Sequence, residues 1–308
     1  MTMVEANGLG FDCTVTGDAA ATPLLLIMGL GMPAALWPDA FVEALAAEGF
    51  RVITFDNRDC GRSTRLEHVP VPNVMRAITR TLLRRKVTAP YTLDDMAADT
   101  LGLLDALGVE RAHVVGASMG GMIAQVMAAR HPARVLSLTS IMSNSGNPGR
   151  KFAFGSWKAL RAIVRPPPPP DDHAAVVAHL LRVFSVIGSP AFRDDLAAVR
   201  PIFERVARLG MYRAGTARQL LAIMATGDRR PLLHEITAPT LVLHGAEDPL
   251  VPLAAGRDTA ANVRGAVLEV IDGMGHDFPP ALLARFAKRI AEHCRAAQPD
   301  TPGQTPVA

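Results

Sequence analysis

The sequence predicts an α/β protein with a mostly parallel, doubly wound sheet that is interrupted by a helical cap insertion. Short apolar runs alternate with helical patterns along the chain. Six runs are expected as strands: Leu24–Met28, Arg51–Asp56, Ala112–Gly116, Leu136–Ile141, Thr240–His244 and Ala266–Ile271. Several of them are apolar nearly throughout, as strands covered on both faces are. The alternation of strand and helix indicates parallel strands joined by right-handed crossovers.

The composition is that of an ordinary globular protein. The 308 residues are 49% apolar and 20% charged, and the formal net charge is +3. This balance excludes an intrinsically disordered chain, and so small a positive surplus gives no reason to expect a nucleic-acid partner. The three cysteines, Cys13, Cys60 and Cys294, are far apart and form no Cys-x-x-Cys pair. A disulfide framework and a structural zinc site are therefore not expected.

The N-terminal region has the features of neither a signal peptide nor a membrane span. A signal peptide opens with basic residues, whereas the first basic residue here is Arg51. Residues 19–38 are uncharged but include Pro23, Pro33 and Pro38, which a spanning helix would not tolerate without support. We therefore expect a cytoplasmic protein, with a buried strand and a glycine-rich loop in this region.

Helix signals lie between the expected strands. The stretch Leu93–Leu107 follows Thr92 at the N-cap position and stops at Gly108, and Met119–Arg130 and Pro280–Arg295 are also expected to be helical. Residues 75–86 predict an amphipathic basic helix. Such a helix can contact a membrane surface, but we interpret it as a surface helix over the core, so membrane contact is not expected.

The strand–helix alternation stops between residues 144 and 232. Four helical stretches are expected there, together with the five consecutive prolines Pro166–Pro170: Phe152–Val164, Ala174–Val186, Pro201–Leu209 and Thr216–Thr226. We interpret residues 144–232 as a helical cap over the carboxyl edge of the sheet. The core is then divided into residues 1–143 and 233–295, and the proline-containing residues 296–308 are expected to be a disordered tail.

The motif that indicates chemistry is Gly-x-Ser-x-Gly at residues 116–120. An expected strand ends just before Ser118 and an expected helix begins just after it, so the serine lies on a strand-to-helix turn, the context that this nucleophile motif requires. The N-terminus of the helix carries partial positive charge. The Met119 amide points toward an oxyanion formed at the serine. Ser118 is therefore the candidate nucleophile, with an incidental serine in a glycine-rich turn as the alternative.

A serine hydroxyl needs a general base, and the chain has nine histidines. His276 is the candidate because it lies in the loop Gly273-Met274-Gly275-His276, directly after an expected strand. Parallel sheets build their sites in loops at the carboxyl ends of strands. His113 and His244, in contrast, lie within or at the end of expected strands and are expected to be structural.

The base in turn needs a carboxylate to orient it. Asp248 lies in a loop directly after the expected strand Thr240–His244, and the adjacent Glu247 is its rival. Asp272 and Asp277 flank the histidine but are too close to it along the chain to orient its ring easily. The candidate catalytic residues are therefore Ser118, Asp248 and His276, in that order.

This chain resembles the α/β-hydrolase fold family, in which the residue order serine, aspartate, histidine is typical. The resemblance covers nearly all of residues 24–290, with the helical insertion as the cap. The segments LLLIMGLG, FDNRDCGRST, VVGASMGG, LVLHGAEDPLVP and GMGH are also similar to the aclacinomycin methylesterase group of serine esterases.

The resemblance implies further roles. The family's second oxyanion amide follows a His-Gly pair, which is Met28-Gly29 in this chain, so this amide falls on Leu30. Together with Met119, Leu30 is the expected oxyanion hole. Asp56, Arg58 and Gly61 match a family turn that we expect to be structural.

The expected function is hydrolysis of a carboxylic ester of a small, apolar or aromatic substrate through an acyl-enzyme. No metal or organic cofactor is expected. A cofactor-free haloperoxidase or perhydrolase, a lactonase and an acyltransferase remain open, because each uses the same three residues, and a noncatalytic small-molecule binding protein is the alternative of a different class. The substrate-binding residues are not predicted, and a homodimer formed through the cap remains open.

Overall fold

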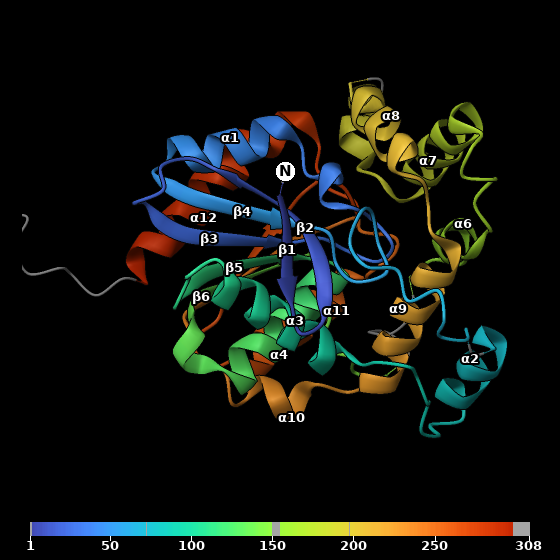
Figure 1. The fold of residues 1–308 in the computed structure, drawn as a ribbon, viewed down its shortest axis with the longest axis horizontal. Coiled ribbons are helices and arrows are strands. Elements are labelled where there is room, and N and C mark those ends of the chain that lie inside the picture. Colours follow the sequence, from blue (N-terminus) through green and yellow to red (C-terminus); the bar gives the residue numbers. More distant parts are fainter. Residues whose placement is uncertain (1, 72, 150–154, 197, 298–308) are drawn as a thin grey trace, which may run out of the picture.

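In the computed structural model, an eight-stranded sheet runs through the molecule with helices on both faces (Figure 1). The structure describes residues 2–71, 73–149, 155–196 and 198–297. The strand order is β1-β2-β4-β3-β5-β6-β7-β8. All neighbouring strands from β4 to β8 pair in parallel, whereas β2 pairs antiparallel with both β1 and β4. The expected α/β architecture is confirmed.

The six expected strands are all present, and two more precede them. The strands are β1 Thr2–Ala6, β2 Leu9–Thr16, β3 Thr22–Ile27, β4 Phe50–Phe55, β5 Ala112–Ala117, β6 Val135–Ile141, β7 Thr240–Gly245 and β8 Val267–Ile271. The hairpin β1–β2 was not predicted from the sequence. Its turn is Asn7-Gly8, and both residues have positive φ angles of 53° and 74°. Asn-Gly between two strand-forming runs is a strong hairpin signal, so this hairpin was predictable.

The helices form one layer on each side of the sheet and a separate group at its edge (Figure 1). They are α1 Asp39–Ala47, α2 Val74–Leu82, α3 Leu93–Ala106, α4 Met119–Arg130, α6 Trp157–Val164, α7 His173–Ile187, α8 Arg200–Leu209, α9 Arg213–Thr226, α10 Arg230–Leu233, α11 Leu253–Asn262 and α12 Leu283–Ala296. Helices α1 and α12 pack together on one face, and α3 and α4 pack together on the other. Helices α1, α10 and α11 were not predicted from the sequence.

Each face of the sheet has its own apolar core, because side chains of successive strand residues point to opposite faces. On β3, Leu25 and Ile27 belong to the core under α3 and α4, whereas Leu24 and Leu26 belong to the core under α1 and α12. All four side chains are fully buried. This double coverage explains why the central strands are apolar at nearly every position.

The segment between β6 and β7 contains α6 to α10, and we call it the helical insertion. Its helices α7 and α8 pack against each other around Val176, Leu180, Phe203 and Val206. Helix α9 contacts both α2 and α3. The prediction of a helix over Phe152–Val164 lies partly outside the described residues, and α6 begins at Trp157. The domain limits at residues 143 and 232 stay a prediction.

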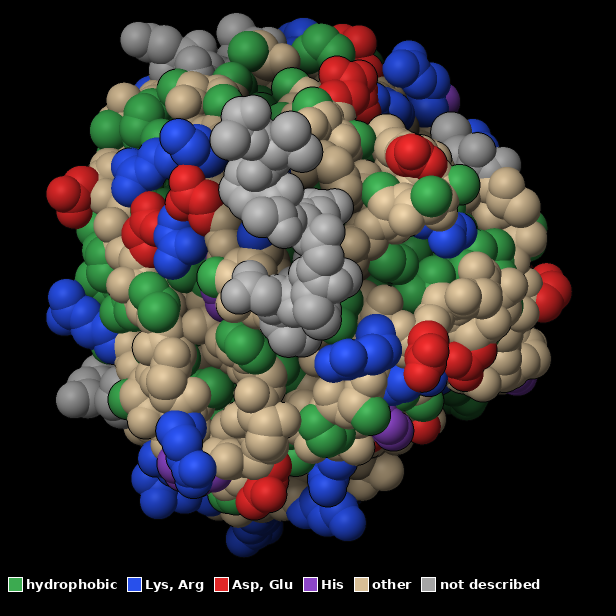
Figure 2. Space-filling view, turned by 90° about the vertical axis from the view of Figure 1, so that its left-hand side faces the viewer, with side chains coloured by type: hydrophobic (Ala, Val, Ile, Leu, Met, Phe, Trp, Pro, Cys, Tyr) green, Lys and Arg blue, Asp and Glu red, His purple; other side chains and the backbone are tan. Residues whose placement is uncertain are grey.

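The described surface is mixed in charge. On the face shown in Figure 2, basic and acidic side chains are interspersed, as the small net charge leads one to expect. Among the described residues, no helix is both long enough and apolar enough to cross a membrane. All three cysteines lie in the described part of the chain and are buried free thiols. The tail predicted for residues 296–308 lies outside the described residues from 298 onward.

Candidate active site

Ser118 lies on a sharp turn between β5 and α4. Its backbone has φ 54° and ψ −118°, a region that non-glycine residues rarely occupy and that costs of order 1–3 kcal/mol. The Ser118 amide donates a hydrogen bond to the Ile141 carbonyl at 2.9 Å, and the Ser143 hydroxyl donates one to the Ser118 carbonyl at 2.8 Å. Strand β6 and the residues after it therefore hold the turn, and its strained conformation presents the Ser118 side chain at the carboxyl edge of the sheet.

The glycines around Ser118 are required by close backbone contacts. A Cβ atom on Gly116 would lie 2.2 Å from the Gly120 carbonyl oxygen, and one on Gly120 would lie 1.9 Å from the Ile27 carbonyl oxygen. Neither contact can be relieved by moving a side chain, because the opposing atoms are backbone. The Gly-x-Ser-x-Gly pattern is therefore a packing requirement of the strand, turn and helix.

The structure brings the three candidate catalytic residues into one chain of hydrogen bonds. His276 Nε2 lies 3.1 Å from Ser118 Oγ, and His276 Nδ1 lies 2.7 Å from Asp248 Oδ2. His276 and Asp248 are buried, with 7% and 6% of their surface exposed, whereas Ser118 is half-buried. These residues are far apart in the sequence but follow β5, β7 and β8, whose carboxyl ends lie along the same edge of the sheet.

Asp248 is held by its own loop, so it can orient the imidazole. Its Oδ1 accepts hydrogen bonds from the Leu250 amide at 2.9 Å and the Val251 amide at 2.8 Å, which leaves Oδ2 for the histidine. The rival Glu247 points elsewhere, because its Oε2 accepts from the Gly273 amide at 2.6 Å. A carboxylate fixed in this way can stabilise an imidazolium and select the ring tautomer.

His244, near the end of β7, supports the loop that carries Asp248. Its Nε2 lies 2.9 Å from the Val251 carbonyl, and its side chain is fully buried. Burial lowers the pKa of His244, which favours the neutral ring. A neutral ring with its proton on Nε2 donates to Val251, so His244 fixes the backbone that holds Asp248. The expectation that His244 is structural agrees with this placement.

The amides of the expected oxyanion hole, Leu30 and Met119, directly follow Gly29 and Ser118 in the sequence. A Cβ on Gly29 would lie 3.2 Å from the Ser118 Cβ, so the loop after β3 passes directly beside the serine. In the described part of the chain, neither the Leu30 amide nor the Met119 amide donates a hydrogen bond to a protein acceptor. Met119 is the first residue of α4, where amides have no partner within the helix.

The loop after β3 is held from two sides. From the helical insertion, Gln219 on α9 accepts a hydrogen bond from the Gly31 amide at 2.7 Å and donates one to the Arg58 carbonyl at 2.8 Å. From the core, the Asn57 side chain donates to the Met28 carbonyl at 3.1 Å. Gln219 is completely buried. No sequence motif surrounds Gln219, so this residue was not predicted, and only its contacts in the folded protein identify it.

The turn at residues 56–61 supports the same loop, as the resemblance implied. Asp56 Oδ1 accepts from the Ala34 amide at 2.6 Å, and its Oδ2 accepts from the Arg62 amide at 2.9 Å. A Cβ on Gly61 would collide with the Asp56 carboxylate at 1.8 Å. Arg58 pairs with the buried Asp99 on α3. Burial raises the pKa of Asp56 to about 6.

The aromatic residues of the helical insertion are engaged mostly in packing. The rings of Phe184 and Phe203 lie 4.8 Å apart in the core between α7 and α8. The Tyr212 ring lies under the Arg65 and Arg218 guanidinium groups. Trp157 is 75% exposed. Phe152 and Phe154 lie outside the described residues.

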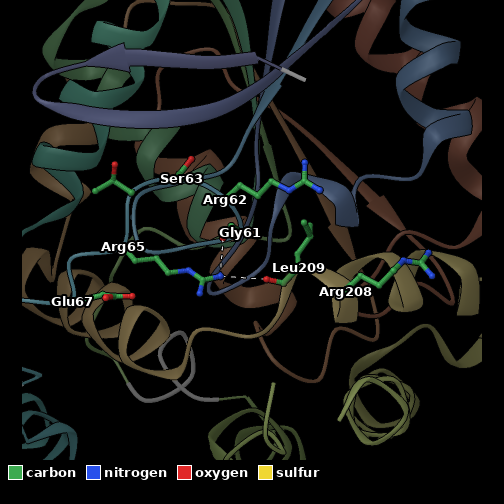
Figure 3. Close-up of a pocket in the computed structure, with 8 residues that line it drawn as sticks. Gly61, Arg62, Ser63, Arg65, Glu67, Arg208 and Leu209 are labelled. Carbon is green, nitrogen blue, oxygen red and sulfur yellow. Dashed lines mark hydrogen bonds between the residues drawn. The ribbon is translucent and has the colours of Figure 1, made fainter. Parts of the chain in front are cut away.

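An open pocket of about 530 Å³ lies apart from the three candidate residues (Figure 3). It is lined by the loop after β4 and the end of α8, and it includes Arg62, Arg65 and Arg208. The Arg65 side chain donates to the Gly61 and Leu209 carbonyls across this pocket.

Within the described residues, no group of three or more histidine, cysteine or acidic side chains could hold a metal ion.

Comparison with known protein families shows to which family the chain belongs. The family model for the alpha/beta hydrolase fold matches residues 22–279. The chain belongs to the α/β-hydrolase fold family. Rhodomycin D methylesterase of Streptomyces peucetius is 30% identical over 302 residues, which cover 91% of this chain and 93% of that protein. The match to the methylesterase of Streptomyces sp. strain C5 is 31% identical with the same coverage. The resemblance to the aclacinomycin methylesterase group is thereby confirmed.

Other α/β-hydrolases match less closely. A Mycobacterium tuberculosis protein named as a non-heme bromoperoxidase is 30% identical over 273 residues, covering 87% of this chain and 90% of that protein. Among solved structures, the enol-lactonase from Burkholderia xenovorans superposes with a TM-score of 0.71 at 24% identity, covering 96% of this chain and all of the other. This structural likeness shows the shared fold.

Proposed function

We propose that this hydrolase cleaves a carboxylic ester with Ser118 as nucleophile, His276 as general base and Asp248 as the residue that orients His276. The observation that supports the proposal is the continuous chain of hydrogen bonds from Asp248 through His276 to Ser118. A serine hydroxyl needs such a base to act as a nucleophile at neutral pH. The methylesterase relatives, which match over nine-tenths of the chain, support the same class of reaction.

The proposed reaction has two stages. His276 Nε2 takes the proton of Ser118 Oγ while the oxygen attacks the ester carbonyl carbon, and the Leu30 and Met119 amides donate to the oxyanion. The protonated imidazole then gives its proton to the leaving alcohol as the carbon–oxygen bond breaks, which leaves an acyl-serine. A water molecule, deprotonated by His276, attacks this ester. The acid leaves, and the proton returns to Ser118.

We further propose a methyl ester of a small apolar or aromatic acid as the substrate. The relatives named as methylesterases suggest the small alcohol. The loop after β3, which passes beside Ser118 at Gly29, carries the apolar and half-buried side chains of Leu30 and Met32. An apolar acyl group gains free energy from burial against such side chains, at about 25 cal/mol per Å².

The proposal is tested with a panel of p-nitrophenyl and methyl esters and the variant Ser118→Ala. We expect turnover by the wild-type protein, faster hydrolysis of methyl esters than of butyl esters of the same aromatic acid, and loss of turnover in Ser118→Ala. A fluorophosphonate probe should label Ser118, as located by mass spectrometry of the digested protein. Labelling at another residue, or turnover that survives Ser118→Ala, would contradict the assignment.

Perhydrolysis is the second candidate function, and the bromoperoxidase relative favours it. In that reaction hydrogen peroxide replaces water in attacking the acyl-serine, and the resulting peracid oxidises bromide. The assay is bromination of monochlorodimedone in acetate buffer with hydrogen peroxide and bromide. Bromination at a rate above that of ester hydrolysis, and absent in Ser118→Ala, would favour this candidate over the esterase.

A further inference from the structure

The end of α7, in the helical insertion, lies against the loop that carries His276. The two segments are so close that a side chain on either glycine at the contact would collide with the other segment. A Cβ on Gly275 would lie 2.5 Å from the Gly188 carbonyl oxygen, and a Cβ on Gly188 would lie 2.7 Å from Asp277 Oδ2. These segments are almost 90 residues apart in the sequence, so this contact is made only in the folded protein.

Hydrogen bonds join the two segments on both sides of the histidine. The His276 amide donates to the Ile187 carbonyl at 2.7 Å. The Gly275 amide donates to Ser189 Oγ at 2.8 Å, and the Ser189 hydroxyl in turn donates to the Asp277 carboxylate. The Ser189 amide also lies 3.1 Å from both carboxylate oxygens of Asp277. Ser189 therefore contacts the residue before His276 and the residue after it.

Ser189 is buried in this contact, and Asp277 is half-buried. Ser189 has 3% of its surface exposed. Burial raises the pKa of Asp277, whereas the hydrogen bonds from Ser189 act to lower it and favour the carboxylate. Within the described residues, the Asp277 carboxylate makes no hydrogen bond with the imidazole ring, whose two nitrogens face Asp248 and Ser118. Asp277 thus acts on the backbone of the loop, and the orientation of the ring is left to Asp248.

We propose that Ser189, through Asp277 and Gly275, is a positioning residue that sets where the helical insertion places the His276 imidazole relative to Ser118. The inference rests on the proposed function of His276 as general base. Asp248 restrains the ring from Nδ1, but it does not set the position of the His276 backbone. A displacement of 1 Å at a reacting group can cost about 100-fold in rate. The hydrogen bonds that hold the backbone of the His276 loop should therefore affect turnover directly.

The proposal predicts a loss in kcat rather than in substrate affinity. The test is Ser189→Ala, assayed with the ester that the wild-type protein hydrolyses best. We expect kcat to fall about 10- to 100-fold, because the imidazole leaves its position relative to Ser118. KM should stay within about twofold, because the buried Ser189 side chain acts on the His276 loop and not on substrate binding.

Ser145→Ala is a matched control. Ser145 is also buried, and its hydroxyl likewise donates to a carboxylate, that of Asp258 on α11, and accepts from a backbone amide, that of Asn147 at 3.2 Å. It makes no contact with the His276 loop among the described residues. We expect Ser145→Ala to lower the urea midpoint of unfolding by as much as Ser189→Ala does, while kcat remains within about twofold of wild type.

Asp277→Asn serves as the conservative variant. The amide side chain keeps an oxygen that accepts from Ser189, so kcat should lie between those of the wild type and Asp277→Ala.

Proton NMR gives an independent readout, because the His276 Nδ1 proton in the bond to Asp248 exchanges faster with water when the ring is less constrained. We expect faster exchange in Ser189→Ala than in Ser145→Ala.

The outcomes separate this inference from the proposed function. If wild-type turnover is abolished by Ser118→Ala but Ser189→Ala keeps the wild-type kcat, the esterase assignment stands and the positioning role is refuted. The same conclusion follows if Ser145→Ala loses as much kcat as Ser189→Ala, since the loss then reflects general stability. A change in KM alone would also refute it, because Ser189 would then act on substrate binding.

Discussion

The buried ion pair between Asp59 and Arg218 gives the strongest prediction about stability. Arg218 on α9 donates to Asp59 Oδ2 at 2.7 Å through Nε and to Oδ1 at 2.6 Å through Nη2. The side chains are 0% and 1% exposed. The Tyr91 hydroxyl and the Leu66 amide also donate to the carboxylate, at 2.9 and 2.8 Å. This cluster joins the helical insertion to the loop after β4.

Arg218→Met should destabilise the protein by about 3–5 kcal/mol, because the buried Asp59 carboxylate loses its charged partner while keeping only two neutral donors. That is a large part of the total stability of about 5–15 kcal/mol that is usual for a folded protein. The measurement is equilibrium urea denaturation followed by tryptophan fluorescence and circular dichroism. A loss below about 1 kcal/mol would refute the argument that the carboxylate depends on Arg218.

The double variant Asp59→Asn/Arg218→Met removes both charges. Asparagine suits position 59, where the backbone has φ 64°, a conformation that asparagine adopts more readily than most residues. We expect the double variant to be more stable than Arg218→Met alone, because no unpaired charge stays buried. If the loss of stability in the double variant equals the sum of the losses in Asp59→Asn and in Arg218→Met, the two residues are not coupled and the reasoning fails.

Three further predictions concern the candidate site and the response to pH. Asp248→Asn should lower kcat about 10⁴-fold, since an amide cannot stabilise the imidazolium and favours the wrong tautomer; single-turnover kinetics measure this, and a loss below tenfold would contradict it. Gln219→Met should lower kcat about 10-fold or more by releasing the loop that carries the Leu30 amide; Gln125→Met, which removes another fully buried glutamine with two hydrogen-bonding partners, is the control and should leave kcat nearly unchanged. Burial lowers the pKa of His113 to about 4, whereas the unfolded chain keeps the usual value of about 6.5. Between these two pH values the unfolded chain binds a proton that the folded protein does not, so stability is lost as the pH falls from 6.5 towards 4. Between pH 7 and pH 5 this loss is about 2 kcal/mol, and His113→Gln should abolish that part of it in urea titrations at the two pH values; an equal pH dependence in both proteins would count against a neutral buried His113.

The fold and the candidate residues were largely predictable because their signals are local. A strand buried on both faces is mostly apolar, as the central residues of β3 and β7 are, and the strand, turn and helix around Ser118 require glycine at fixed positions. His276 and Asp248 were found because each follows an apolar strand directly. Helix α4 was predicted at its observed limits, Met119–Arg130, for the same reason.

Tertiary structure decided how these local pieces support one another. Neither Gln219 nor Ser189 lies in a motif, and their partners are more than 80 residues away in the sequence. The ion pair of Asp59 with Arg218 likewise spans 159 residues. Sequence patterns report how a residue fits its own strand or helix, whereas these contacts depend on where the helical insertion packs. The amino-acid sequence by itself therefore determined the six parallel strands, the turn at Ser118 and the identities of the candidate residues. Only the tertiary structure decided what holds these residues in place, because hydrogen bonds between distant segments produce no repeating pattern in the sequence.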